Sequence, residues 1–148
     1  MPELPRILYT DSLAGVEAQH LHGFFVGWPQ PPDAAALLRI LRGSSHVWLA
    51  REPDSGRVLG LITALSDGVL TAFIPLLEVL PDYQGQGIGT QLVQRMFTTL
   101  TPFYSVDLVC DDAVAPFYER LGLRRMLAMS QRNYANQSGA PAAPTLEH

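Results

Sequence analysis

The sequence contains no lysine: all ten basic residues are arginines, and only Arg124 and Arg125 stand together. A protein that binds duplex nucleic acid needs a basic face to offset the phosphates. This chain has a formal net charge of −4, and its sequence shows no such face. We therefore expect no nucleic acid among its partners.

Cysteine and long apolar runs are also scarce. Cys110 is the only cysteine, which excludes an internal disulfide and favours a reducing, cytoplasmic compartment. The sequence shows no secretory signal pattern and no apolar run long enough to cross a bilayer, so we expect no membrane partner. The four histidines lack the spacing of metal ligands, and we expect no metal.

The residues that are present describe a globular protein. Hydrophobic residues make up 47% of the 148 residues and charged residues 16%, a composition that can bury a core. We predict a single domain over residues 1–135. Residues 136–148 are rich in small residues and proline and are expected to form a flexible tail, in which residues 146–148 resemble an expression tag.

The first half of the chain alternates helical and extended patterns. Proline and glycine mark the boundaries, and Asp33 is a good N-cap candidate before an apolar helical face. The expected elements are strand 6–10, a helix that begins at Asp11 or Ser12, a helix from Asp33 to Gly43, and strands 46–51 and 57–65 paired as a hairpin through the turn 53–56.

The second half contains the longest apolar strand, at residues 69–80. Pro75 lies inside it and cannot donate a ladder hydrogen bond, so we expect a bulge or a splay nearby. The segment 87–100 has an apolar stripe at helical spacing. The remaining expected elements are strand 104–110 with Cys110 buried, a helix at 113–121 capped by Asp111 or Asp112 and closed by Gly122, and a last strand at 127–134. Helices that alternate with strands indicate a mixed α/β domain.

A glycine-rich loop, Gln84-Gly85-Gln86-Gly87-Ile88-Gly89, connects the long strand to the helix that follows. The first backbone N–H groups of a helix lack internal partners, and glycines let an anion approach them. A nucleotide P-loop would need a lysine, and a dinucleotide fingerprint would need glycine at the position of Thr90. Two readings remain open, a pyrophosphate site and a glycine turn that only starts the helix.

Two motifs resemble the GNAT superfamily of N-acetyltransferases. The segment Leu77–Gly89 resembles the family's acetyl-CoA-binding motif, in which Gln/Arg-x-x-Gly-x-Gly/Ala follows a strand ending in Leu-x-Val-x-Pro. The segment Pro116–Leu123 resembles its second motif, usually Tyr-Glu-Lys-x-Gly-Phe at its end. The two motifs stand in the family's order. The segment Phe24-Phe25-Val26-Gly27-Trp28-Pro29 resembles that of a bacterial subgroup of the family.

The resemblance implies a fold and a cofactor site. The fold is a central, mostly antiparallel mixed sheet of about six or seven strands with about four flanking helices, splayed where acetyl-CoA binds. Asp111 stands where the family often has asparagine, which puts that contact with pantetheine in doubt. The implied cofactor-binding residues are Leu77, Val79, Gln84, Gly85, Gln86, Gly87, Ile88, Gly89, Thr90, Asp111, Phe117 and Arg120.

Tyr118 and Glu78 are the candidate catalytic residues. The resemblance implies that Tyr118 is the general acid that protonates the CoA thiolate, whereas composition alone favours a core tyrosine. Glu78 is the only acid in the long strand, and burial would raise its pKa toward that of a base. An edge position that faces solvent or an arginine is the alternative for Glu78.

The acceptor side is less well defined. Phe24, Phe25 and Trp28 lie among glycines and prolines, so they form either part of the core or the wall of an acceptor pocket. Asp67 is a further candidate for binding the substrate. Arg132, near the last expected strand, would suit a carboxylate.

The sequence thus predicts an acetyl-CoA-dependent N-acetyltransferase that acts on a primary amine of a small molecule or peptide by direct attack. It would work as a monomer or homodimer, without a metal. The alternatives are a non-catalytic acyl-CoA-binding sensor or interaction module and a protein that holds a different nucleotide in the same loop.

Overall fold

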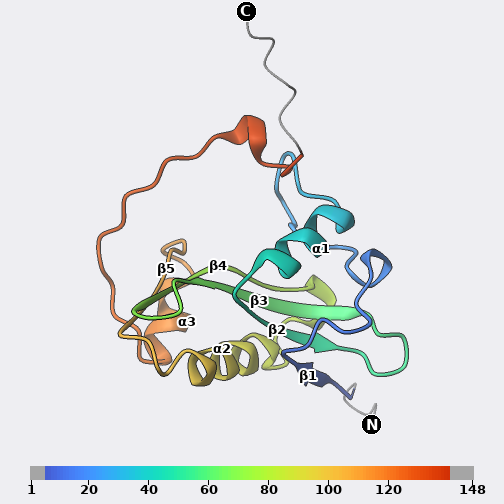
Figure 1. Ribbon diagram of the computed structural model, residues 1–148, viewed down its shortest axis with the longest axis horizontal. Helices are drawn as coiled ribbons and strands as arrows, with labels where there is room; N and C mark the ends of the chain where they lie inside the picture. The colour runs from blue at the N-terminus through green and yellow to red at the C-terminus, as the bar shows by residue number, and fades with distance from the viewer. Residues whose placement is uncertain (1–5, 141–148) are drawn as a thin grey trace, which may run out of the picture.

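The computed structural model describes residues 6–140, which form a five-stranded sheet in the order β1-β2-β3-β4-β5 (Figure 1). Strands β1 to β4 pair antiparallel, and β5 pairs parallel with β4. The strands are β1 (Leu8–Thr10), β2 (His46–Arg51), β3 (Val58–Ser66), β4 (Thr71–Val79) and β5 (Ser105–Leu108).

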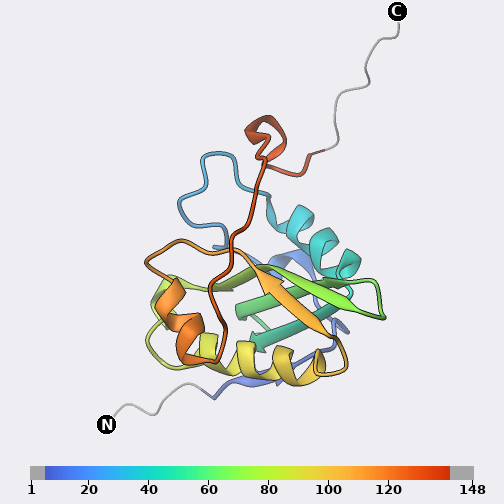
Figure 2. The same cartoon turned by 90° about the vertical axis from the view of Figure 1, so that its left-hand side faces the viewer.

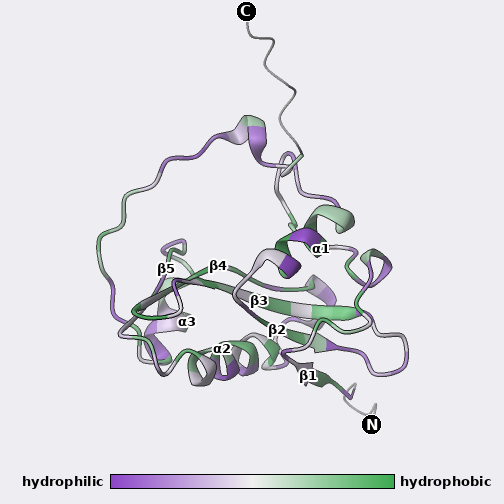
Figure 3. Ribbon diagram, in the orientation of Figure 1, coloured by the Kyte–Doolittle hydropathy of each residue, from purple (hydrophilic) through white to green (hydrophobic). Residues whose placement is uncertain are grey.

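Helices cover both faces of the sheet. Helix α1 lies on one face, and α2 and α3 lie on the other (Figure 1, Figure 2). Each face has its own cluster of buried apolar side chains, one between the sheet and α1 and one between the sheet and α2, and the strands between them are largely apolar (Figure 3). The helices are α1 (Ala34–Gly43), α2 (Ile88–Thr99) and α3 (Ala115–Arg120), with short 3₁₀ turns η1 (Ala18–His20), η2 (Pro81–Tyr83) and η3 (Tyr134–Asn136).

The predicted hairpin and its preceding helix are confirmed. The Asp33 carboxylate caps α1 by accepting a hydrogen bond from the Ala36 N–H at 2.7 Å. Strands β2 and β3 then pair antiparallel along their length. Gly56 in the connecting turn has a φ of 75°, a conformation that glycine adopts without strain.

The irregularity predicted at Pro75 is also confirmed. Thr63 of β3 pairs with Leu76, and Leu65 pairs with Phe73, so two residues of β4 stand opposite one of β3. On the other side of β4, pairing with β5 ends at Ile74. The last five residues of β4 therefore run on to Val79 without pairing with β5, and this is the splay in the sheet.

Helix α2 begins close against the sheet because Gly60 of β3 has no side chain. A Cβ at this position would lie 3.1 Å from both Ile88 Cγ2 and Leu92 Cδ1. Val93 and Met96, further along the helix, are fully buried against the sheet. The first turn of α2 therefore packs directly on β3.

The structure corrects four expectations from the sequence. The helix expected from Asp11 or Ser12 is only the 3₁₀ turn η1, since prolines and glycines interrupt the segment that follows it. Helix α3 has Val114 at its N-cap without a side-chain cap, and the Asp111 carbonyl, not a carboxylate, accepts from the Val114 N–H. Cys110 is exposed, because β5 ends two residues before it. The strand expected at 127–134 does not form, which leaves five strands and three α-helices in the described chain.

The end of the chain was predicted to be a flexible tail. Residues 136–140 belong to the described structure, and the Gln137 side chain there accepts a hydrogen bond from the Gln30 N–H at 3.0 Å. Residues 141–148, which include the expected tag, lie outside the described residues. No helix within residues 6–140 is long and apolar enough to cross a membrane.

Candidate active site

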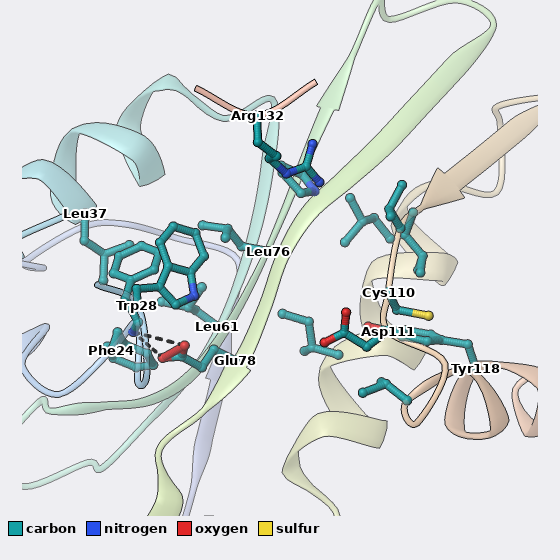
Figure 4. Close-up of a pocket in the computed structure, with 17 residues that line it drawn as sticks. Phe24, Trp28, Leu37, Leu61, Leu76, Glu78, Cys110, Asp111, Tyr118 and Arg132 are labelled. Carbon is teal, nitrogen blue, oxygen red and sulfur yellow. Dashed lines mark hydrogen bonds between the residues drawn. The ribbon is translucent and has the colours of Figure 1, made fainter. Parts of the chain in front are cut away.

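A cavity of about 350 Å³ opens at the splay between β4 and β5. Figure 4 shows β4 passing between two groups of side chains. Phe24, Trp28 and Glu78 lie on one side, toward α1, whereas Asp111 and Tyr118 lie on the other. The bulge at Pro75 and the loss of pairing with β5 after Ile74 together open β4 to the cavity.

The glycine loop, residues 84–90, lies beyond the end of β4 and starts helix α2. Gly85 and Gly87 have φ values of 78° and 84°, and a Cβ on either would meet nothing within 4 Å. The first intrahelical hydrogen bond runs from the Gln91 N–H to the Gly87 carbonyl at 3.0 Å. The N–H groups of residues 88–90 are thus free of intrahelical partners, and the positive end of the helix dipole adds to them. This is the geometry of an anion site.

The other residues predicted for the cofactor lie around this loop. Gln84 turns back and donates from Nε2 to the Val79 carbonyl at 3.0 Å, which ties the loop to the end of β4. Gln86 is exposed, and Thr90 is half-buried in the first turn of α2. Leu77 and Val79 pack their side chains into the core on the α2 face of the sheet.

Of the residues predicted from the second motif, Phe117 of α3 reaches the same region. Phe117 comes close to the first turn of α2, since a Cβ on Gly89 would lie 3.9 Å from its Cζ. Arg120 is exposed at the end of α3. Asp111 is exposed and lines the cavity.

Tyr118 combines burial with access to the cavity. Its side chain is 8% exposed and packs edge-on against Phe117, with ring centroids 5.0 Å apart. Burial, with a smaller effect from the negative charge that the Cys110 thiolate would carry, raises the pKa of Tyr118 to about 12. The phenol therefore keeps its proton at neutral pH and is available as a hydrogen-bond donor.

Glu78 lies on the opposite face of β4, toward α1. Both of its carboxylate oxygens accept from the Phe25 N–H, at 2.7 and 3.0 Å. Desolvation raises the pKa of Glu78, and hydrogen bonds from the Phe25 and Val26 N–H groups oppose that rise. The half-buried carboxylate thus meets a loop that lies 53 residues earlier in the sequence.

The aromatic loop, residues 23–28, contributes both to the core and to the cavity wall. Phe25 is 6% exposed and adopts a φ of 62°, which is rare for a residue with a side chain. Its ring packs 4.8 Å from that of Trp28, which is 40% exposed. Phe24 is half-buried, and all three rings line the cavity.

Asp67 lies at the turn between β3 and β4 and does not line the cavity. Its Oδ1 accepts from the N–H groups of Val69, Leu70 and Thr71. These hydrogen bonds lower the pKa of Asp67. The Asp67 carboxylate therefore binds backbone N–H groups of its own turn, away from the cavity.

Several cavity residues were not singled out from the sequence as binding residues. The bulge at Pro75 was the one sequence signal that could have found Pro75 and Leu76. Val114 and Cys110 reach the cavity because the strand and helix around them are shorter than expected. These lining residues are Pro75, Leu76, Leu108, Val109, Cys110 and Val114. Across the described part of the chain, no three His, Cys, Asp or Glu side chains come together as a metal site.

Comparison with known proteins decides the family. The model of the acetyltransferase (GNAT) family matches residues 13–123, three quarters of the chain. The chain belongs to the GNAT acetyltransferase family. This membership confirms the resemblance seen in the two motifs and the fold class predicted from it.

Solved structures of other members support the assignment. A protein of Deinococcus radiodurans that is described, provisionally, as an acetyltransferase is 50% identical to this chain. The match covers 96% of this chain and 99% of that one, with a TM-score of 0.90. A GNAT-family acetyltransferase from Streptococcus pneumoniae is 28% identical over 86% of this chain and 98% of that one, with a TM-score of 0.70.

Curated relatives are larger proteins. A histone acetyltransferase of Glycine max, TAP1, is 34% identical over 66% of this chain, and a chloroplastic serotonin N-acetyltransferase 2 of Oryza sativa is 31% identical over 75%. The match covers 46% of the first and 58% of the second, so the chain spans about half the length of these relatives.

Proposed function

We propose that this protein transfers an acetyl group from acetyl-CoA to a primary amine. The observation that carries the proposal is the juxtaposition of three features along one strand. Strand β4 loses its pairing partner at Ile74, the exposed stretch borders the cavity, and the same strand leads into the glycine loop. A thioester and an amine can meet only where a long cosubstrate lies beside an open pocket.

The residues present fit acetyl-CoA. A pyrophosphate needs bare backbone N–H groups, and Gly85 and Gly87 leave open space above them. The pantetheine arm is an amide chain, which can lie along an unpaired strand as a peptide does, and β4 offers such a stretch up to Val79. When bound, acetyl-CoA supplies an activated acyl carbon and a thiolate leaving group.

Tyr118 is suited to meet that leaving group. The amine nitrogen forms its bond to the acyl carbon as the carbon–sulfur bond breaks, which places negative charge on sulfur. The phenol, whose high pKa keeps it protonated, donates a hydrogen bond to the departing thiolate, gives its proton to the sulfur, and takes a proton back from solvent. Backbone N–H groups of the exposed part of β4 stabilise the oxyanion that develops on the carbonyl.

Glu78 serves the other half of the reaction. An amine must lose a proton to attack, and Glu78 carries the carboxylate that lies across β4 from Tyr118. Its raised pKa makes it a better proton acceptor than an ordinary glutamate. It also attracts the ammonium form of an acceptor into the cavity.

The acceptor itself is a small or peptide amine with an apolar body. Phe24, Phe25 and Trp28 present aromatic surface to the cavity, and aromatic faces also attract cations. Two relatives are named for the acetylation of histone and of serotonin, and these names support an amine acceptor without fixing its size.

Tyr118→Phe tests the proposal. The variant keeps the ring and loses the donor, and the release of CoA thiol in the presence of an amine panel is expected to slow by about 10²-fold or more. Acetyl-CoA binding, measured by the rise in Tm, should stay unchanged. Tyr104→Phe is the matched control, because Tyr104 is 86% exposed and does not line the cavity. A wild-type protein that neither binds acetyl-CoA nor releases thiol contradicts the proposal.

A non-catalytic acyl-CoA sensor is the second candidate. Asp111, which stands where the family often has asparagine, favours it, because a carboxylate cannot donate to pantetheine unless it is protonated. For a sensor, acetyl-CoA raises the Tm of wild-type protein and of Tyr118→Phe equally, and no amine in the panel releases thiol.

A further inference from the structure

Cys110 carries the only thiol of the chain, and this thiol lines the cavity at the splay. Strand β5 ends at Leu108, so Cys110 follows it in a segment that no longer pairs with β4. The side chain is exposed and forms no disulfide. A molecule that enters the cavity can therefore reach the sulfur, and accessible thiols are the ones that react.

Tyr118 of α3 is a second, independent feature of the same cavity, and it indicates where a ligand atom lies. The residue is only 8% exposed and lines the cavity. Figure 4 shows its ring pointing from α3 toward β4. Within residues 6–140 its hydroxyl makes no hydrogen bond. A nearly buried hydroxyl without a partner is costly, so a polar ligand atom is expected at this point of the cavity.

The Cys110 sulfur lies near this hydroxyl. Figure 4 shows both residues on the same side of β4, opposite Glu78 and Trp28. A negative charge on the sulfur contributes to the raised pKa of Tyr118, and this effect falls off with the distance between the two groups. A ligand sulfur that meets the Tyr118 hydroxyl therefore also comes near Cys110.

We propose that Cys110 is a site of reversible modification by the disulfide of CoA, and that the CoA retained there excludes acetyl-CoA. This site rests on the proposed function, in which the Tyr118 hydroxyl meets the CoA sulfur. The Cys110 thiolate attacks that sulfur, and a new sulfur–sulfur bond forms as the bond between the two CoA halves breaks. Cys110 is oxidised, the departing CoA half is reduced to its thiolate, and that thiolate takes a proton from water, so no further oxidant is needed.

The two halves of CoA disulfide occupy different parts of the site. The glycine loop holds the pyrophosphate of the retained half, because Gly85 and Gly87 leave its backbone open. The departing half takes the place of the acetyl group and extends into the cavity of about 350 Å³, which opens at the splay. Glutathione disulfide carries the same sulfur–sulfur bond but no pyrophosphate. The site should therefore distinguish CoA disulfide from glutathione disulfide.

Intact-mass spectrometry of the full chain, treated separately with CoA disulfide and with glutathione disulfide, gives the first test. At equal concentrations, Cys110 is expected to gain CoA at least about tenfold faster than glutathione, since binding at the glycine loop raises the local concentration of CoA disulfide. Excess acetyl-CoA should slow the reaction with CoA disulfide only, and dithiothreitol should reverse the modification. Equal rates with the two disulfides, or a rate that acetyl-CoA does not change, would make Cys110 an ordinary exposed thiol and overturn the proposal.

Two glycine variants separate binding at the glycine loop from plain thiol reactivity. Gly85 and Gly68 both have a φ of 78° and open space around them, but only Gly85 lies in the glycine loop. Gly85→Ala is expected to slow the reaction with CoA disulfide by about tenfold and to leave the reaction with glutathione disulfide unchanged, whereas Gly68→Ala should change neither. A reaction with CoA disulfide that is equally fast in the two variants contradicts the proposal.

The proposed function is measured separately in Cys110→Ser, which cannot form the mixed disulfide. Acetyl-CoA should raise the Tm of this variant, and pretreatment with CoA disulfide should abolish the rise in wild type but not in Cys110→Ser. A protein that acetyl-CoA stabilises, but whose Cys110 does not prefer CoA disulfide, keeps the proposed function and loses the modification. A protein that acetyl-CoA does not stabilise contradicts both.

Discussion

Two loops beside β4, the glycine loop and the aromatic loop, both turn through residues with positive φ, but they are held in place by different parts of the chain. The glycine loop places Gly85 and Gly87 at positive φ, and the aromatic loop does so with Gly23, Phe25 and Gly27. The glycine loop leads straight into α2, so it is held by its own neighbours in sequence. The aromatic loop is held by the Glu78 carboxylate, 53 residues away. The cofactor side of the site is therefore local in sequence, whereas the acceptor side is not.

Gly60→Ala should disturb the cofactor side most. The added Cβ would lie 3.1 Å from Ile88 Cγ2 and Leu92 Cδ1, and overpacking of this kind costs about 1–3 kcal/mol of unfolding free energy. Because α2 must shift outward, acetyl-CoA affinity is expected to fall as well. Urea unfolding and a Tm titration with acetyl-CoA measure the two effects.

Gly43→Ala is the matched control for this substitution. Gly43 ends α1, and a Cβ there would meet nothing within 4 Å. Alanine in place of a helical glycine is expected to stabilise by about 0.5–1 kcal/mol. Equal changes in unfolding free energy for Gly60→Ala and Gly43→Ala would show that α2 does not pack closely against Gly60.

The contrast between the loops also explains what could be predicted from the sequence. Proline, glycine and capping residues act on their neighbours, so the hairpin, α1, the bulge at Pro75 and the start of α2 were all predicted. The hydrogen bond from Phe25 to Glu78 was not, because no pattern in either segment indicates the other. The strand expected at 127–134 had the right side chains but lacks a partner, since a strand forms only where an edge is within reach.

Gly85→Ala and Gly68→Ala test whether the glycine loop binds an anion or only turns the chain. Both glycines have a φ of 78° and open space around them. Each substitution should cost the same backbone strain, about 1 kcal/mol. Only Gly85→Ala is expected to weaken acetyl-CoA binding, by about tenfold, since the new methyl group lies where the pyrophosphate would approach. Isothermal titration measures the affinity. Equal acetyl-CoA affinities in the two variants would mean that the glycine loop only turns the chain and does not bind the pyrophosphate.

The smallest expected effect concerns the carboxylate that holds the aromatic loop. The pKa of Glu78 is raised in the folded protein, mainly by desolvation, so folding favours its protonated form. The stabilisation is complete below the ordinary pKa of glutamate and is lost as pH rises through the raised value. Wild-type stability should therefore decline over that window relative to Glu78→Gln.

The stability contribution of Asp67 has the opposite pH dependence, because three backbone hydrogen bonds lower its pKa. This contribution is lost as pH falls through the lowered pKa. Urea titrations of wild type, Glu78→Gln and Asp67→Asn across acidic pH measure both slopes. A Glu78→Gln curve parallel to wild type across the pH window of Glu78 would mean that folding does not raise the pKa of Glu78.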